Sequence, residues 1–325
     1  MFCFRSVWAA LALLALPRLA LAQASTREAL PEAWWTGPLL APSANTLPRG
    51  HVLVEPYLFD VISQGFYNTH GTRISSPHAN GLGSLTYINY GLANKFTVGL
   101  IPVFSCNELS NGPSSSGIGA GDLTVQAQYR LHLFREGSWK PTISINVQET
   151  LPTGKYERLN DRPSDGMGSG AYTTTLGFYT QTFFWMPNRR ILRMRFNVAP
   201  ARSRTANIED VSVYGTSQGF RGHAKPGDSI FVDAALEYSL TQRWVLALDA
   251  TWRNQTNTHV SGYNLSDPSQ PVILNSGSSR TFGVAPAVEY NFNSKVGVIA
   301  GLRVFPSGRN TTKSITPAVA VNIVH

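Results

Sequence analysis

Charged residues are scarce in this 325-residue sequence, where Asp, Glu, Lys and Arg together make up 14% of the residues. Ordinary soluble domains carry about 25%. After the first 22 residues no segment offers about twenty uninterrupted apolar residues, which excludes a transmembrane helix from that part of the chain. A secreted chain with these two deficits is typical of an extracellular β-domain or of the bacterial outer membrane.

Secretion is predicted by the N-terminus. Arg5 gives a positive start, residues 7–16 form an apolar run, and Ala20-Leu21-Ala22 is a small-residue cleavage site. This pattern predicts a signal peptide over residues 1–22, cleaved near Ala22, and an uncleaved membrane anchor is the alternative.

Cysteine is nearly absent, and the leader contains one of the two. Removal of Cys3 leaves Cys106, so we expect a fold that does not depend on a disulfide framework. The formal charge of +8 falls to +6 after cleavage, because the leader carries two arginines and no acid. That charge is too small and too diffuse to argue for a nucleic-acid partner, and we expect none.

The clearest pattern that is present runs through residues 119–133. From Asp122 to His132 every second residue is polar, and the residues between them are apolar or aromatic. A strict period of two predicts a β-strand with one wet face and one apolar face. At about 3.3 Å per residue this strand is long enough to cross a bilayer obliquely.

Similar runs recur along the chain, and their spacing predicts an antiparallel up-and-down barrel of about twelve strands. The predicted strands are 51–62, 82–92, 94–104, 120–133, 139–150, 170–184, 190–199, 228–240, 243–254, 280–292, 295–305 and 314–325. Short connections alternate with long ones. The long connections are residues 63–81, 105–119, 151–169, 200–227 and 255–279. Transmembrane barrels sort their loops in this way, with short periplasmic turns and longer extracellular loops, so the all-β class is a transmembrane β-barrel over 51–325.

Residues 23–50 precede the barrel as an irregular lead-in that contains Trp34 and Trp35. Two interpretations stay open: a loosely held periplasmic tail, or a segment that folds into the lumen and plugs it.

Charged residues on the polar faces of the strands are the candidate lumen-lining residues. Arginine in hydrocarbon costs about 2–4 kcal/mol, so these side chains are expected to face a water-filled lumen. The set contains Arg130, His132, Arg193, Arg195, Arg253, Arg303, Asp122, Asp233, Glu237, Asp249 and Glu289. Either the arginines select anionic or polar aromatic solutes, or these charges pair with one another and fill a narrow interior.

An enzyme is the weakest of the function classes. A lipid hydrolase would need a serine activated by histidine near the outer rim, and the sequence offers only His259-Val260-Ser261. No metal cluster, phosphate loop or dinucleotide fingerprint is found, so we expect no cofactor and no metal.

Two motifs carry a family resemblance. Gly119-Ala120-Gly121-Asp122-Leu123 and the later Leu151-Pro152-Thr153-Gly154 resemble segments of a bacterial outer-membrane β-barrel family that is assigned to transport in the phenol-degradation meta pathway. Tyr90-Gly91-Leu92-Ala93-Asn94 is similar to a turn of the same family. The resemblance implies an outer-membrane barrel that passes small hydrophobic or aromatic compounds.

Together these features predict an outer-membrane, porin-like channel of a Gram-negative bacterium that passes small molecules. The alternative is a non-conducting structural or surface-interaction barrel. The expected partners are outer-membrane lipid and lipopolysaccharide, the barrel assembly machinery and a small-molecule solute.

Overall fold

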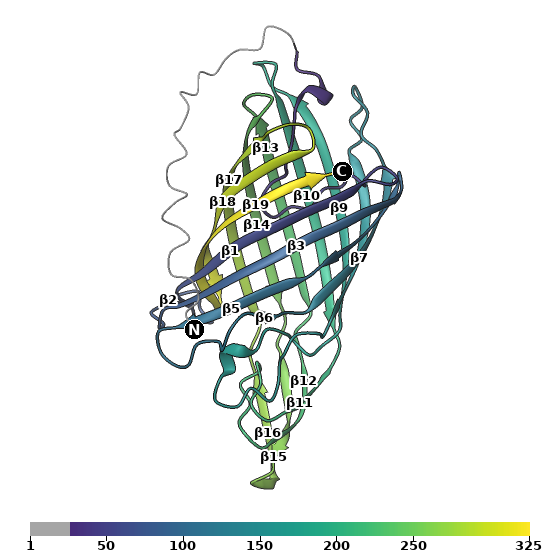
Figure 1. The fold of residues 1–325 in the computed structure, drawn as a ribbon. Helices are drawn as coiled ribbons and strands as arrows, with labels where there is room; N and C mark the ends of the chain where they lie inside the picture. Colours follow the sequence, from purple (N-terminus) through teal and green to yellow (C-terminus); the bar gives the residue numbers. More distant parts are fainter. Residues whose placement is uncertain (1–26) are drawn as a thin grey trace.

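The computed structural model describes residues 27–325, and the predicted signal peptide lies outside the described residues. Twelve antiparallel strands close into a tilted barrel, because β1 pairs with β19 on one side and β3 on the other. The barrel strands are β1 (Val52–Tyr67), β3 (Ala79–Ala93), β4 (Phe96–Ile101) with β5 (Val103–Leu109), β6 (Gly119–Ala120) with β7 (Leu123–His132), β8 (Thr142–Leu151), β9 (Thr173–Trp185), β10 (Ile191–Ser203), β13 (Ser229–Ser239), β14 (Trp244–Gln255), β17 (Ser279–Asn291), β18 (Val296–Arg309) and β19 (Thr311–Val324). The predicted all-β transmembrane barrel is confirmed (Figure 1).

Alternation along each strand determines which side chains face outward. On β14, Leu246 and Leu248 are exposed on the outer wall, whereas Ala247 and Asp249 are buried inside. Aromatic side chains gather at the end of the barrel that carries the short turns. There the ring centroids of Trp244 and Tyr290 lie 4.7 Å apart. An apolar wall with an aromatic rim matches the hydrocarbon core and interface of a bilayer.

Two predicted strands are interrupted, which corrects the boundaries given above. Pro102 separates β4 from β5, since proline has no N–H to donate to the ladder, and β3 pairs with both pieces. Residues 121 and 122 likewise separate β6 from β7. Pro56, Pro286 and Pro317 stay within β1, β17 and β19.

The long loops carry a second sheet that the sequence did not predict. Strands β11 (Ala206–Glu209), β12 (Phe220–Lys225), β15 (His259–Asn264) and β16 (Asp267–Asn275) pair in that order beyond one end of the barrel (Figure 1). Their inner face buries Ile208, Phe220 and Val260 in a second hydrophobic cluster. Within residues 27–325 the remaining short elements are β2 (Arg73–Ile74) and the 3-10 turns η2 (Leu30–Glu32) and η3 (Pro163–Asp165).

The lead-in passes into the barrel from the short-turn end (Figure 1). Leu39 is 4% exposed and packs in the main hydrophobic cluster with Ala285, Ile299 and Ala320. None of the helices within residues 27–325 is long and apolar enough to span a membrane.

Candidate functional site

Carboxylates on the inner wall hold the backbone of the lead-in. Asp249 accepts hydrogen bonds from the N–H groups of Leu39 and Ala41, both at 3.0 Å. Glu289 accepts one from the N–H of Thr36 at 2.7 Å. Because residues 36–44 of the lead-in form no β-ladder with the barrel, their buried N–H groups need such acceptors.

Inner-wall donors satisfy the carbonyl groups of the same segment. The Nη1 of Arg195 donates to the Ala41 oxygen at 2.7 Å, and the Nδ2 of Asn197 donates to the Pro42 oxygen at 2.9 Å. Ser144 donates through its hydroxyl to the Ala44 oxygen. The lead-in is therefore fixed by side chains of four barrel strands, β8, β10, β14 and β17, over a stretch of nine residues (36–44).

A buried charge cluster lies beside this segment. Glu237 is 0% exposed and pairs with Arg193, its register neighbour on β10, and with Arg195 at 3.1 Å. The guanidinium of Arg193 also lies 4.5 Å from the ring centroid of Trp35. Such a cluster satisfies charges that the low-dielectric interior would otherwise penalise heavily.

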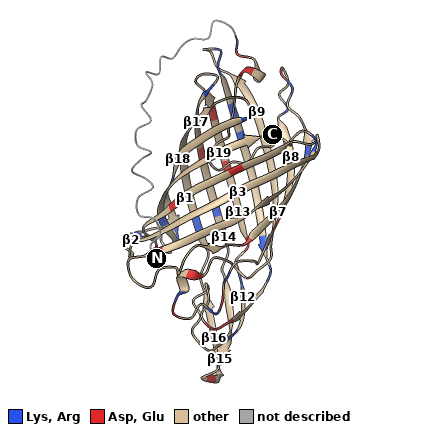
Figure 2. Cartoon of the chain, viewed as in Figure 1, with Lys and Arg blue, Asp and Glu red and all other residues tan. Residues whose placement is uncertain are grey.

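Other predicted residues are placed apart from this cluster. His132 lies at the short-turn end, with its Nδ1 at 2.8 Å from the Pro141 oxygen. Asp122 lies at the long-loop end, where it bonds to loop backbone. Arg130 is half-buried on β7 and Arg253 is exposed on β14. Figure 2 shows Lys, Arg, Asp and Glu as short coloured patches on barrel strands that are otherwise tan.

Asp233 differs from the other buried acids. It is 0% exposed, and neither of its carboxylate oxygens has a hydrogen-bond partner among the described residues. The buried Oε1 of Glu289 and Nε of Arg303 share this condition.

Two cavities adjoin the lead-in, and we name them by their linings. The aromatic chamber, about 270 Å³, is lined by Phe59, Phe305 and Arg303 among others. The polar chamber, about 260 Å³, is lined by Gln126, Gln128 and Gln148 among others.

The two chambers share one boundary, which we call the neck. Leu39 and Leu40 of the lead-in line both chambers, as do Tyr57 of β1 and Tyr87 of β3. The tyrosine rings meet edge to face with their centroids 6.0 Å apart. The lumen is therefore a divided path in which four side chains separate an apolar space from a polar one.

Sequence reasoning missed these aromatic residues, because the search for lumen-lining groups considered charged residues. The available signal was the period of two itself. Tyr57 and Phe59 alternate with Pro56 and Leu58 on β1, so the inner face of that strand carries aromatic side chains next to the carboxylate of Glu55.

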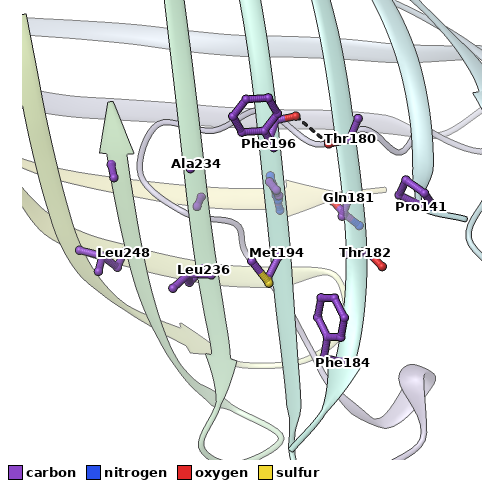
Figure 3. A pocket seen from close by; sticks show the side chains of 13 residues that line it. Pro141, Thr180, Gln181, Thr182, Phe184, Met194, Phe196, Ala234, Leu236 and Leu248 are labelled. Carbon is purple, nitrogen blue, oxygen red and sulfur yellow. Dashed lines mark hydrogen bonds between the residues drawn. The ribbon is translucent and has the colours of Figure 1, made fainter. Parts of the chain in front are cut away.

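The outer wall carries a separate depression of about 420 Å³ (Figure 3). Phe184, Met194, Phe196, Leu236 and Leu248 surround it, and these side chains belong to four neighbouring strands, β9, β10, β13 and β14. Thr180 donates to the Phe196 carbonyl at 2.8 Å and so satisfies its hydroxyl in this apolar setting. The depression faces outward and is not part of the lumenal path.

The pair that suggested a hydrolase lies on β15 of the external sheet. The Nδ1 of His259 is 2.9 Å from the Oδ1 of Asn275, and no hydrogen bond joins His259 to Ser261 among the described residues. The residue opposite Ser261 is His223, which contacts Asn207 at 3.0 Å. Within residues 27–325 no group of three or more His, Cys, Asp or Glu side chains is placed to hold a metal ion.

Comparison with known proteins supports the fold. The family model described as "Putative MetA-pathway of phenol degradation" matches residues 50–316. An outer-membrane channel from Pseudomonas putida F1 aligns over 88% of this chain and 100% of its own, with a TM-score of 0.68 and 16% identity.

Two further barrels align more loosely. The transport unit of the autotransporter AIDA-I from Escherichia coli covers 94% of this chain and 95% of its own, with a TM-score of 0.45 and 11% identity. A mutant of the TodX monoaromatic hydrocarbon channel covers 90% and 94%, with a TM-score of 0.38 and 12% identity. A search among proteins of curated function finds no match.

Proposed function

The chain belongs to the outer-membrane family described as "Putative MetA-pathway of phenol degradation", and we propose that it is a channel that passes small apolar or aromatic molecules across the outer membrane. The divided lumen carries this proposal. An apolar solute meets aromatic walls in one chamber and must pass Leu39, Leu40, Tyr57 and Tyr87 to reach the polar chamber.

The lead-in acts in this proposal as a fixed restriction rather than a tail. Its backbone is bonded to Asp249, Glu289 and Arg195, so it narrows the lumen and leaves the neck as the remaining route. Free diffusion of large hydrophilic solutes is incompatible with such an interior, whereas a single aromatic ring suits the size of the chambers.

The surroundings of the barrel follow from the same proposal. The signal peptide is cleaved near Ala22, the barrel assembly machinery inserts the chain, and outer-membrane lipid covers the apolar wall. The external sheet and long loops face lipopolysaccharide. No catalytic step is assigned to the chain.

A structural or surface-interaction barrel is the competing class, and electrical recordings separate the two. The refolded mature protein would be measured in planar bilayers beside a variant that lacks residues 23–50. We expect small current steps from the complete chain and larger steps from the shortened one, because the lead-in occupies the lumen. Silence from both proteins, each shown to be folded by its heat-modifiable electrophoretic mobility, would remove the pore and favour the structural role.

A neck variant tests the solute path. Tyr87→Ala removes one wall of the neck and should raise the entry of a labelled aromatic solute into liposomes several-fold. Tyr290→Ala, on the outer wall, is the matched control and should leave entry unchanged. Equal entry through both variants and the unmodified protein would contradict a path through the neck.

A further inference from the structure

Arg303 is the single charged residue in the lining of the aromatic chamber, as far as residues 27–325 show. The central carbon of its guanidinium lies 4.5 Å from the ring centroid of Phe305, a cation–π contact that holds the group at the chamber wall. Its Nε is buried and has no hydrogen-bond partner within that part of the chain. This guanidinium therefore keeps donors for a ligand.

The two lumenal arginines that are buried among the described residues are already engaged. Arg193 and Arg195 pair with Glu237, and Arg195 also donates to the lead-in. Among the described residues no carboxylate oxygen lies within the 4.0 Å of an ion pair with Arg303. Arg253, Asp233 and Asp249 act on it electrostatically from farther away. The described lining of the chamber itself contributes one positive charge, which matches a monoanion.

The aromatic walls are built into the strands. A Cβ on Gly83 would come within 2.4 Å of the Phe59 ring, and a Cβ on Gly283 would come within 3.0 Å of the Phe305 ring. Glycine at these two positions of β3 and β17 lets each ring pack directly against the neighbouring strand. The rings are thereby fixed before any ligand arrives, which lowers the entropy lost on binding.

The size of the chamber limits the ligand. A closed apolar cavity of about 150 Å³ accepts benzene, and this one measures about 270 Å³. A single ring with a carboxylate and a short substituent fills it. The planar fork of a guanidinium matches a carboxylate in two parallel hydrogen bonds.

We propose that the aromatic chamber binds a small aromatic carboxylate, with its ring between Phe59 and Phe305 and its carboxylate on Arg303. This deepens the proposed function by naming a substrate class. It rests on that function only for the claim that the bound molecule is also transported. Binding itself can be measured whether or not the barrel conducts.

The test is equilibrium binding of 4-fluorobenzoate to the refolded full-length mature protein, followed by the ¹⁹F line width at pH 7.5. Arg303→Gln should weaken binding at least tenfold. Arg303→Lys should have an affinity between those of Arg303→Gln and the unmodified protein, because lysine keeps the charge but lacks the planar fork of donors. Arg130→Gln removes a predicted lumen-lining arginine that is outside the chamber lining and is not among the groups that act electrostatically on Arg303, so this variant should bind as the unmodified protein does. Acetate, which has the charge without the ring, should fail to compete.

Equal affinity of Arg303→Gln and the unmodified protein, with both shown to be folded, would overturn the assignment. Competition by acetate as strong as by benzoate would overturn the role of the rings. Solute passage through the neck, together with unchanged binding in Arg303→Gln, would support the channel and contradict the proposed substrate class. Binding that depends on Arg303 in a barrel that never conducts would support the site and contradict the channel.

Discussion

The Asp122 carboxylate accepts a hydrogen bond from the backbone N–H of Gly154 at 3.0 Å. Its second oxygen accepts from the N–H of Ser169 at 2.7 Å. The Thr153 hydroxyl donates to the Gly121 oxygen at 3.1 Å beside them. The two motifs that carry the family resemblance are thus in direct contact, and their joint role is to fix the long loop that follows β8 against the start of β7.

Asp122→Ala is expected to release that loop. It removes an acceptor for three donors, the third being the Ser169 hydroxyl at 2.8 Å, and bonds to a charged group contribute about 1.5–3 kcal/mol each. We expect faster proteolysis within residues 151–170 and a loss of about 2–3 kcal/mol in urea unfolding. Asp161→Ala changes an exposed acid of the same loop and serves as control. Equal protease resistance of the two variants would contradict this role.

The barrel could be read from the sequence because its signal is local. A period of two needs only the residues of one strand, as between Asp122 and His132, and loop lengths show which connections share an end. All twelve predicted runs correspond to strands of the barrel. The break at Pro102 was not predicted. A proline in a run does not by itself show that the strand is interrupted, since Pro56, Pro286 and Pro317 stay within theirs.

The candidate site was less accessible, because its contacts join distant segments. Thr36 meets Glu289 and Leu39 meets Asp249 across more than two hundred residues, and no local pattern encodes such pairs. The external sheet arises in the same way, since β12 pairs with β15 from a different loop. The charged inner faces were predicted, but the aromatic one around Tyr57 was not.

Glu237→Ala should destabilise the barrel strongly. The substitution leaves Arg193 and Arg195 buried without their shared carboxylate, and breaking a buried pair costs about 3–5 kcal/mol. Urea unfolding in detergent, followed by tryptophan fluorescence, measures the loss. Glu149→Ala, in which a partly exposed glutamate accepts a hydrogen bond from Thr174, is the control and should lose far less. A Glu237→Ala midpoint equal to that of the control would show that the cluster is not structural.

Asp233→Asn should change the stability of the barrel in the opposite direction and raise its free energy of unfolding. Both oxygens of this buried carboxylate are without hydrogen-bond partners among the described residues, so the charge is desolvated with little direct compensation. An amide of nearly the same shape removes that charge. We expect a higher urea midpoint for Asp233→Asn than for the unmodified protein, and a lower midpoint would mean that the carboxylate charge stabilises the fold.

The external sheet is expected to loosen in acid through Asp210, which follows β11. The hydrogen bond from the Nη1 of Arg221 at 3.0 Å, together with the Gly219 N–H, lowers the pKa of Asp210. A depressed folded-state pKa gives stability that is present above the unfolded value of about 3.9 and is lost as pH falls through the folded value. Amide protection of β11 and β12 should therefore fall below about pH 4. Asp210→Asn should show weaker protection that no longer varies across this range, and an unchanged acid profile would exclude Asp210 as the cause.

Ser261→Ala is expected to leave membrane lipids unchanged. A serine nucleophile needs a histidine within hydrogen-bond reach, yet His259 is turned to Asn275 and His223 to Asn207. His223, His259 and Ser261 lie on the polar face of the external sheet rather than in a closed cleft. An acyl intermediate there would be open to water. Mass spectrometry of outer-membrane phospholipids from cells that express the unmodified protein, Ser261→Ala or His223→Ala should give one common profile. Lysophospholipid that accumulates with the unmodified protein and disappears in both variants would instead assign hydrolysis to Ser261 and His223.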